Sequence, residues 1–181
     1  MTGSAPSGPL DPRPGVSLRR VLFVCTGNSC RSPMAETLFR ARLAGRAPWE
    51  AASAGIFAAE GFPASEGALR ALDEIGLDGS AHRTQPVTRE RVESSAWILA
   101  LDRGHLDFLL RKFPDAAPRI RLLSSFGLAG GSPDVPDPAG QNLFMYRRIR
   151  DRIDQLVADL ILFLVQQPPA AESGRTGEAP S

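Results

Sequence analysis

Short apolar runs alternate along the chain with longer segments in which apolar residues recur every three or four positions. Strands are predicted for four apolar runs, at residues 21–24, 51–57, 96–101 and 120–123. Helices are predicted for five amphipathic segments, at residues 32–45, 63–76, 88–95, 102–113 and 143–166. This alternation predicts a single three-layer α/β domain, with a twisted, parallel four-stranded sheet covered by helices on both faces.

The domain is expected to span residues 18–167, between two tails rich in glycine, proline and serine. We expect the tails, residues 1–17 and 168–181, to be disordered. The first tail lacks the apolar stretch of a signal peptide. The apolar run 156–165 is too short to cross a bilayer and is interrupted by Asp159. With 181 residues and 43% apolar composition, the chain can form one sizeable core.

Charge and cysteine content exclude several classes of protein. The formal net charge of +1 argues against nucleic acid or an anionic membrane as the main partner. The two cysteines lie in one short segment, so they cannot form the disulfide framework of a secreted protein. We therefore expect a cytoplasmic protein. His82 and His105 lie far apart and no metal-ligand cluster is visible, so neither a metal nor a cofactor is predicted.

The residues best suited to chemistry form the segment Cys-Thr-Gly-Asn-Ser-Cys-Arg-Ser at 25–32, between a predicted strand and a predicted helix. The backbone N–H groups and the dipole of such a helix start favour a bound anion. The same field is expected to lower the pKa of Cys25 and so to favour its thiolate. Arg31 offers a planar fork for phosphate oxygens. Cysteine and arginine at this spacing also occur by chance, but Gly27 and Asn28 suit the tight loop that a phosphate site needs.

We therefore expect a phosphate-binding loop with its own nucleophile. Its members are Thr26, Gly27, Asn28, Ser29, Cys30 and Arg31. Ser32 can donate a hydrogen bond to a Cys25 thiolate. A general acid is also needed, because a phosphate ester or phosphoramidate leaves poorly without a proton. The proline-stiffened segment 132–138 supplies two candidates, Asp134 and Asp137.

The run VLFVCTGNSCRSPMAE closely resembles the active-site signature of the low-molecular-weight protein tyrosine phosphatase family. Further segments that resemble the family lie at residues 53–55, 82–83, 99–102 and 134–138, so that the similarity covers about residues 20–166. The resemblance implies a flavodoxin-like fold, a phosphorylated protein as substrate and a cysteinyl-phosphate intermediate on Cys25. It also implies that Arg31 binds phosphate and that Asp137 is the general acid and base, with Asp134 as a turn residue.

The resemblance further implies a hydrogen-bond network behind the loop, formed by Asn28, Ser32, Ser53 and His82. Ordinary packing is the alternative interpretation for Ser53 and His82. Cys30 is a candidate partner for a reversible disulfide with Cys25, which would protect the nucleophile from further oxidation. The alternative is that Cys30 only fills space in the loop.

The substrate pocket is expected to involve Ser29, Phe57 and Ala139. Phosphotyrosine enzymes of the family typically carry a bulky aliphatic residue in place of Ser29 and an aromatic residue in place of Ala139. Protein arginine phosphatases of the family carry threonine at the Ser29 position and a run similar to Ser-Ala-Gly-Ile-Phe at 53–57, but they too usually keep an aromatic residue near the Ala139 position. We predict a protein tyrosine phosphatase, with phosphoarginine as the alternative substrate, acting as a monomer or weak homodimer.

Two other functions fit part of the pattern. Thioredoxin-coupled arsenate reductases share the fold and a similar loop, but they need further cysteines, and this chain has none beyond Cys30. They also usually carry glutamine where this chain has Pro33. A phospho-binding module without turnover is the other alternative. It would be attractive if Cys25, Arg31 or Asp137 were replaced, but all three are present.

Overall fold

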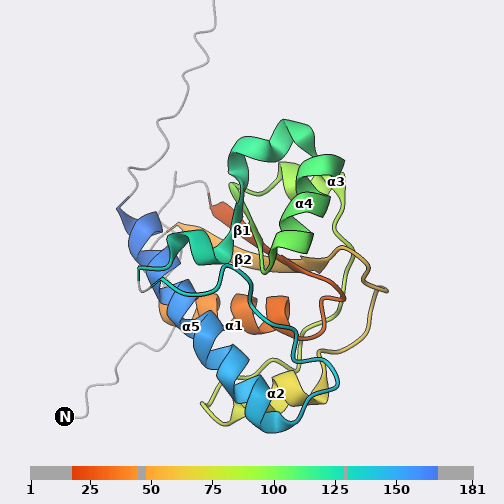
Figure 1. Ribbon diagram of the computed structural model, residues 1–181, viewed down its shortest axis with the longest axis vertical. Coiled ribbons are helices and arrows are strands. Elements are labelled where there is room, and N and C mark those ends of the chain that lie inside the picture. The colour runs from red at the N-terminus through yellow and green to blue at the C-terminus, as the bar shows by residue number, and fades with distance from the viewer. Residues whose placement is uncertain (1–17, 45–47, 129, 167–181) are drawn as a thin grey trace, which may run out of the picture.

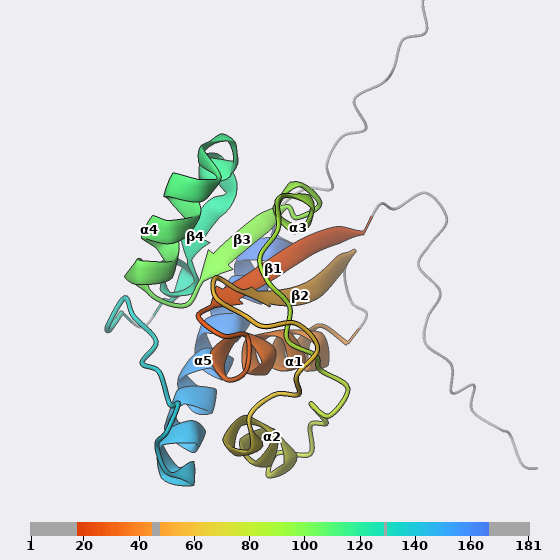
Figure 2. The same ribbon diagram turned by 90° about the vertical axis from the view of Figure 1, so that its right-hand side faces the viewer.

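The computed structural model describes residues 18–44, 48–128 and 130–166, and these form three layers (Figures 1 and 2). The strands are β1 (Arg19–Cys25), β2 (Trp49–Gly55), β3 (Trp97–Ala100) and β4 (Ile120–Leu122). They are parallel and lie in the order β2-β1-β3-β4. This order is that of a flavodoxin-like sheet, and it confirms the predicted fold class. The tails expected at 1–17 and 168–181 lie outside the described residues, as does residue 167 of the expected domain.

Helices cover both faces of the sheet. The α-helices are α1 (Arg31–Leu43), α2 (Glu66–Asp73), α3 (Arg89–Glu93), α4 (Arg103–Lys112) and α5 (Leu143–Val165). Two 3₁₀ helices are η1 (Pro114–Arg119) and η2 (Leu123–Phe126). Helices α1, α2 and α5 pack on one face, while α3 and α4 lie on the other (Figure 2). No helix among the described residues is long and apolar enough to cross a membrane.

The central strand β1 explains how the chain builds two cores. Successive side chains of a strand point to opposite faces. Val21 and Phe23 therefore join the core beneath α1 and α5, while Leu22 and Val24 join the core beneath α3 and α4. All four side chains are fully buried. A strand that is buried on both faces has a continuous apolar sequence, which is the pattern seen at residues 21–24.

The predicted boundaries differ from the observed ones where polar groups decide them. The helix expected at 63–76 begins only at Glu66, because the Ser65 side chain accepts a hydrogen bond from the N–H of Ala68 and caps it. The strand expected at 51–57 is shifted to Trp49–Gly55, since this is the register in which it pairs with β1. The two 3₁₀ helices were not predicted.

Three candidate segments meet at the carboxyl edge of the sheet. Cys25 ends β1, and Asp102 follows β3. The strand order reverses between these two neighbours, which is where α/β sheets bind ligands. The segment that carries Asp137 is tied to the same edge, because the N–H of Val135 donates to the carbonyl of Leu101 at 2.9 Å. The fold therefore brings the predicted nucleophile and the predicted acid together.

Candidate active site

The loop after β1 forms a tight cradle that leads into α1. Its N-cap residue, Cys30, makes no side-chain hydrogen bond to the helix, so no cap occupies the N–H groups of the first turn. Asn28 adopts a left-handed conformation with φ of 55°, which asparagine tolerates better than most residues. A Cβ atom at Gly55 would lie 2.6 Å from the Thr26 carbonyl oxygen. Glycine at this position lets β2 approach the loop closely enough to hold it.

Cys25 is buried at the base of the cradle. Its Sγ lies 3.0 Å from the Ser32 Oγ. Burial raises the pKa of the Cys25 thiol above its ordinary value, although hydrogen bonds from Ser32 and the charge of Arg31 act in the opposite direction. The lowered pKa expected from the sequence is therefore wrong for this arrangement of side chains. The reason is that the thiol is fully buried, and the cost of burying a thiolate exceeds what the hydrogen bonds and the charge of Arg31 offset.

Arg31 is held on several sides. Its Nη1 donates to Asp102 Oδ2 at 2.8 Å and to the Val135 carbonyl at 3.1 Å, and its Nη2 donates to Asp137 Oδ2 at 2.8 Å. Its side chain is only 4% exposed. The Nε–H group is buried and has no hydrogen-bond partner among the described residues. A buried donor without a partner is rare, and a phosphate oxygen in the adjoining loop would supply the acceptor.

The structure separates the two carboxylates proposed as the acid. Asp134 accepts hydrogen bonds from the backbone N–H and the guanidinium of Arg103, at the start of α4. These contacts lower the pKa of Asp134. Asp137 instead reaches Arg31, and its side chain is 45% exposed. Asp137 is therefore the carboxylate that lies beside the loop and can also meet water.

The residues expected behind the loop do lie together there. The Asn28 side-chain amide donates to Ser32 Oγ at 2.8 Å and to Ser53 Oγ at 2.9 Å. Its oxygen accepts from the N–H of Gln85 at 2.9 Å. The ring Nε2 of His82 lies 2.8 Å from the Asn28 carbonyl oxygen. Ser53 and His82 thus make polar contacts to the loop in addition to packing, and these contacts hold Asn28 in its left-handed conformation.

Sequence reasoning missed four residues that complete the polar surroundings of the loop. They are Glu36, Gln85, Asp102 and His105. Glu36 accepts from Ser53 at 2.5 Å, and its place four positions after Ser32 on the same helix was an available signal. Asp102 caps α4 by accepting from the His105 N–H, and its position directly after a buried strand was the other available signal.

His105 is buried, unlike most histidines, and it contacts the loop. Its Nε2 lies 2.9 Å from Thr26 Oγ1, and its Nδ1 lies 3.0 Å from Asp102 Oδ1. Burial lowers the pKa of His105 to about 4, against the opposing charge of Asp102. The ring is therefore neutral at neutral pH. No role was predicted for His105, because its contact with the phosphate loop appears only in the fold.

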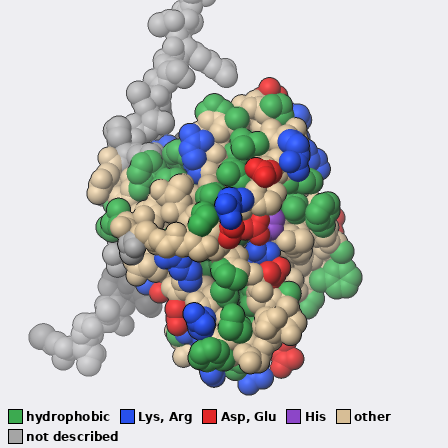
Figure 3. Space-filling view, in the orientation of Figure 1, with side chains coloured by type: hydrophobic (Ala, Val, Ile, Leu, Met, Phe, Trp, Pro, Cys, Tyr) green, Lys and Arg blue, Asp and Glu red, His purple; other side chains and the backbone are tan. Residues whose placement is uncertain are grey.

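The rim of the site contains one exposed aromatic ring. Phe57 is 73% exposed and packs edge-on against Phe108, and its N–H donates to the Thr26 carbonyl. Ser29 is half-buried in the loop and Ala139 is exposed. Figure 3 shows acidic, basic and histidine side chains gathered near the middle of one face of the molecule. Two of the three residues expected in the substrate pocket, Ser29 and Ala139, are therefore small, and the third is an exposed ring.

Cys30 lies behind the loop beside two hydroxyl groups. Its Sγ is 3.2 Å from Ser65 Oγ and 3.5 Å from the hydroxyl of Tyr146 in α5. Cys25 and Cys30 are both free thiols. The disulfide between them remains a prediction.

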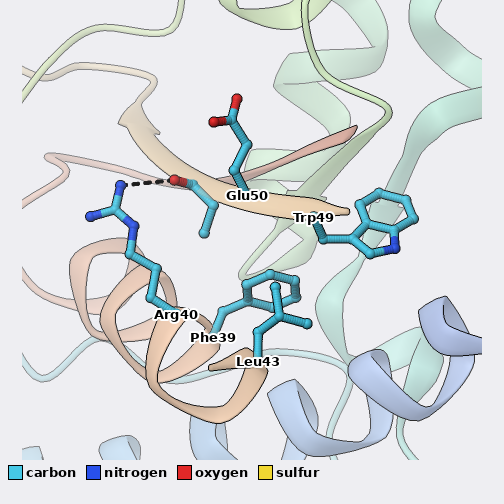
Figure 4. Close-up of a pocket in the computed structure, with 6 residues that line it drawn as sticks. Phe39, Arg40, Leu43, Trp49 and Glu50 are labelled. Atoms are coloured by element: carbon cyan, nitrogen blue, oxygen red, sulfur yellow. Dashed lines mark hydrogen bonds between the residues drawn. The ribbon is translucent and has the colours of Figure 1, made fainter. Parts of the chain in front are cut away.

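A pocket lined by residues from α1 and β2 lies away from this site (Figure 4). Its residues are Phe39, Arg40, Leu43, Trp49, Glu50 and Ala51. Trp49 begins β2, whose other end, Gly55, contacts the loop, so this pocket lies at the opposite edge of the sheet. Among the residues that the structure describes, no cluster of histidine, cysteine and acidic side chains could hold a metal ion.

A family model described as low molecular weight phosphotyrosine protein phosphatase matches residues 20–169. The chain belongs to this family. One relative is a protein-arginine-phosphatase from Geobacillus stearothermophilus, 40% identical over 139 residues, which are 76% of this chain and 90% of the relative. Another is a low molecular weight protein-tyrosine-phosphatase from Streptomyces coelicolor, 42% identical over 130 residues, or 66% of this chain and 77% of the relative.

Solved structures agree with this assignment. An arginine phosphatase from Geobacillus stearothermophilus superposes with a TM-score of 0.75 at 38% identity, covering 81% of this chain and 93% of that one. A low molecular weight protein tyrosine phosphatase from T. tengcongensis gives a TM-score of 0.76 at 41% identity, covering 80% and 99%. This phosphatase family thus includes similar relatives that are named for two different phosphorylated residues.

Replacing Asn28 with alanine is expected to lower the free energy of unfolding by about 2–4 kcal/mol, because three buried hydrogen bonds lose their partner. Urea denaturation measures the change. Asn28→Gly is the matched control, since glycine keeps the left-handed conformation but lacks the amide. Equal stability of Asn28→Gly and the wild type would contradict the supporting role of the amide.

Proposed function

We propose that this protein is a cysteine-dependent phosphatase that removes phosphate from side chains of other proteins through a cysteinyl-phosphate on Cys25. One observation carries the proposal: a buried thiol and a buried, unpartnered Arg31 Nε–H lie at the two ends of a loop that opens an uncapped helix. A phosphoryl group is the ligand that uses both a nucleophile and a fork of donors. Membership of the family supports the same activity.

The first step transfers the phosphoryl group to the enzyme. Arg31 exchanges Asp137 for phosphate oxygens, and the N–H groups of residues 26–31 bind the same oxygens. The Cys25 thiolate attacks phosphorus while the bond to the leaving atom breaks, and Asp137 gives its proton to that atom. Hydrogen bonds from Ser32 stabilise the thiolate. Donors that are already in position make electrostatic stabilisation the largest contribution.

The second step hydrolyses the cysteinyl-phosphate. Asp137, now a carboxylate, takes a proton from a water molecule that attacks phosphorus, and the sulfur–phosphorus bond breaks to return the Cys25 thiolate. The exposed side of the Asp137 carboxyl gives water access to this position. Both steps use the chain's own residues to move the proton, so the reaction as proposed runs without a metal.

The reactive form requires the proton on Asp137 and not on Cys25. Entry of phosphate favours this arrangement, because it takes the place of Asp137 on Arg31 and leaves that carboxylate free to carry the proton. The fork of Arg31 remains in place through its second carboxylate, Asp102. Binding of the substrate therefore favours the reactive form, in which Asp137 carries the proton and Cys25 is a thiolate.

We propose phosphoarginine as the preferred substrate group. A phenyl ring is held best between apolar or aromatic surfaces, but Phe57 is exposed and Ser29 and Ala139 are small. A guanidinium gains from the Ser29 hydroxyl and, once Asp137 has given up its proton, from the Asp137 carboxylate, whereas a phenol gains little from either. Phosphotyrosine stays the second candidate, because the exposed Phe57 ring beside the loop can still stack on a phenol.

Replacing Ser29 with isoleucine is expected to lower kcat/KM for a phosphoarginine peptide by about 10-fold or more. The value of kcat/KM for a phosphotyrosine peptide should stay unchanged or rise. Both peptides are assayed with the wild type and the variant, with EDTA present. Ser29→Thr is the matched control and should keep the preference. A wild-type preference for phosphotyrosine that Ser29→Ile does not change would contradict the assignment to phosphoarginine.

The same assay separates the remaining alternatives. Turnover of neither peptide, together with reduction of arsenate, would favour the reductase, although the chain holds no third cysteine for the electron relay. Binding without turnover would favour the phospho-binding module. The cytoplasmic location and the monomer or weak homodimer remain predictions, which fractionation and light scattering test.

A further inference from the structure

Four side chains form a closed ring of polar contacts beside the loop. Arg31 Nη1 donates to Asp102 Oδ2 at 2.8 Å, and Arg31 Nη2 donates to Thr26 Oγ1 at 3.2 Å. His105 joins the other two members, with Nε2 at 2.9 Å from Thr26 Oγ1 and Nδ1 at 3.0 Å from Asp102 Oδ1. The His105 side chain is 3% exposed. The ring therefore connects Arg31 to α4 by two separate routes.

The directions of the hydrogen bonds fix the state of the imidazole. Arg31 can only donate, so of the two side chains that contact Thr26 Oγ1, only His105 Nε2 can accept the hydroxyl proton. His105 Nε2 then acts as an acceptor, and the proton of the neutral ring lies on Nδ1, facing Asp102. The Nδ1–H group meets the carboxylate at an angle outside ordinary hydrogen-bond geometry, but a bare lone pair there would be repelled by the negative charge.

A protonated imidazole would break this order. Its Nε2–H would donate to Thr26 Oγ1, and the hydroxyl proton would have no acceptor among the four members of the ring. The charged groups facing the ring are Asp102, Arg31, Asp137 and Asp134. Three of these four groups are acidic and favour a charged imidazole, but burial outweighs them and keeps the imidazole neutral.

We propose that His105 is a positioning residue, which holds Thr26 and Asp102 so that Arg31 presents its fork to the phosphoryl group. The inference rests on the function proposed above. Once phosphate displaces Asp137, the side-chain contacts that still orient Arg31 are those to Asp102 and Thr26, and His105 contacts both. Its role is therefore largest when substrate is bound.

The tautomer of His105 is tested without any activity. The chain has only two histidines, so two-dimensional NMR of protein labelled with isotopic nitrogen in its histidine rings gives two sets of signals, and the set lost in His105→Gln belongs to His105. At neutral pH the inference requires a neutral ring with its proton on Nδ1. A proton on Nε2, or a charged ring, would overturn it.

Kinetics then test whether the ring acts on Arg31. Thr26→Val removes the hydroxyl, His105→Gln removes the imidazole, and each is expected to lower kcat/KM and weaken inhibition by inorganic phosphate about 10-fold, since misplaced catalytic groups lose rate steeply. Thr26→Ser should restore most of both. Because the two residues act through one ring, the double variant should lose little more than either single variant.

A matched control separates positioning from loss of stability. Leu110 also lies on α4, where it is partly buried against the core beneath α3 and α4. It is not a member of the ring. Leu110→Ala should lower Tm without changing kcat/KM or phosphate inhibition. Wild-type kinetics in Thr26→Val, or fully additive losses in the double variant, would overturn the role of His105. A wild-type protein that shows the expected His105 tautomer but hydrolyses no phosphorylated peptide would instead refute the proposed function.

Discussion

Cys25→Ser is expected to lower kcat/KM by at least about 10⁴-fold while the protein stays folded and still binds inorganic phosphate. Removal of an enzyme's nucleophile costs rate on this scale, because the remaining donors can bind the phosphoryl group but cannot accept it. The Arg31 fork and the uncapped start of α1 do not depend on the Cys25 side chain, so we expect both to remain after the substitution. Steady-state kinetics on the better peptide substrate and calorimetry with phosphate measure the two quantities.

Cys30→Ser is the matched control for this prediction. It removes the other thiol of the loop, whose neighbours are Ser65 and Tyr146 rather than Ser32. We expect it to retain kcat/KM within a few-fold. Retention of activity by Cys25→Ser, or an equal loss in Cys30→Ser, would contradict the assignment of the nucleophile.

Asp137→Asn has the second largest expected effect. General acids contribute about 10²–10⁴-fold, so kcat for a substrate with a poor leaving group, such as phenyl phosphate, should fall by about this factor. The fall should be much smaller for p-nitrophenyl phosphate, whose leaving group departs without a proton. The difference between the two substrates isolates protonation of the leaving atom from any general damage to the site.

Asp134→Asn provides the comparison, since Asp134 lies in the same loop but pairs with Arg103 at the start of α4. We expect it to change kcat for either substrate by less than about 2-fold, because an exposed ion pair contributes little. Equal losses for phenyl and p-nitrophenyl phosphate in Asp137→Asn would show that Asp137 only holds Arg31. A large loss in Asp134→Asn would move the acid to that residue.

The fold was predictable because its signals are local. The fully buried run at 21–24 and the amphipathic run at 143–166 each specify one element through periodicity alone. The start of α2 and the register of β2 were harder to predict, since they depend on the Ser65 cap and on pairing with β1. The short 3₁₀ helices carry no periodic signal.

The site was predictable where residues are adjacent in sequence and less so where contacts are distant. The loop 25–32 is one segment, so its phosphate-binding pattern could be read directly. The partners of Arg31 and Thr26 in the fold, Asp102 and His105, come from another strand end, and their roles depend on the sheet order that brings β3 beside β1. The pKa of Cys25 was predicted in the wrong direction, because the sequence does not reveal how deeply the thiol is buried.

Direct detection of the phosphorylated enzyme tests the central claim most sharply. The Asp137→Asn variant is mixed with p-nitrophenyl phosphate, because attack by Cys25 proceeds with this leaving group while hydrolysis of the intermediate is slowed. The reaction is quenched within the first turnover, and mass spectrometry of the peptide containing Cys25 and Cys30 locates any added phosphoryl group. The account predicts one phosphoryl group on the Cys25 sulfur, which disappears as turnover ends. Phosphate on another residue, or an unmodified enzyme during active turnover, would contradict it.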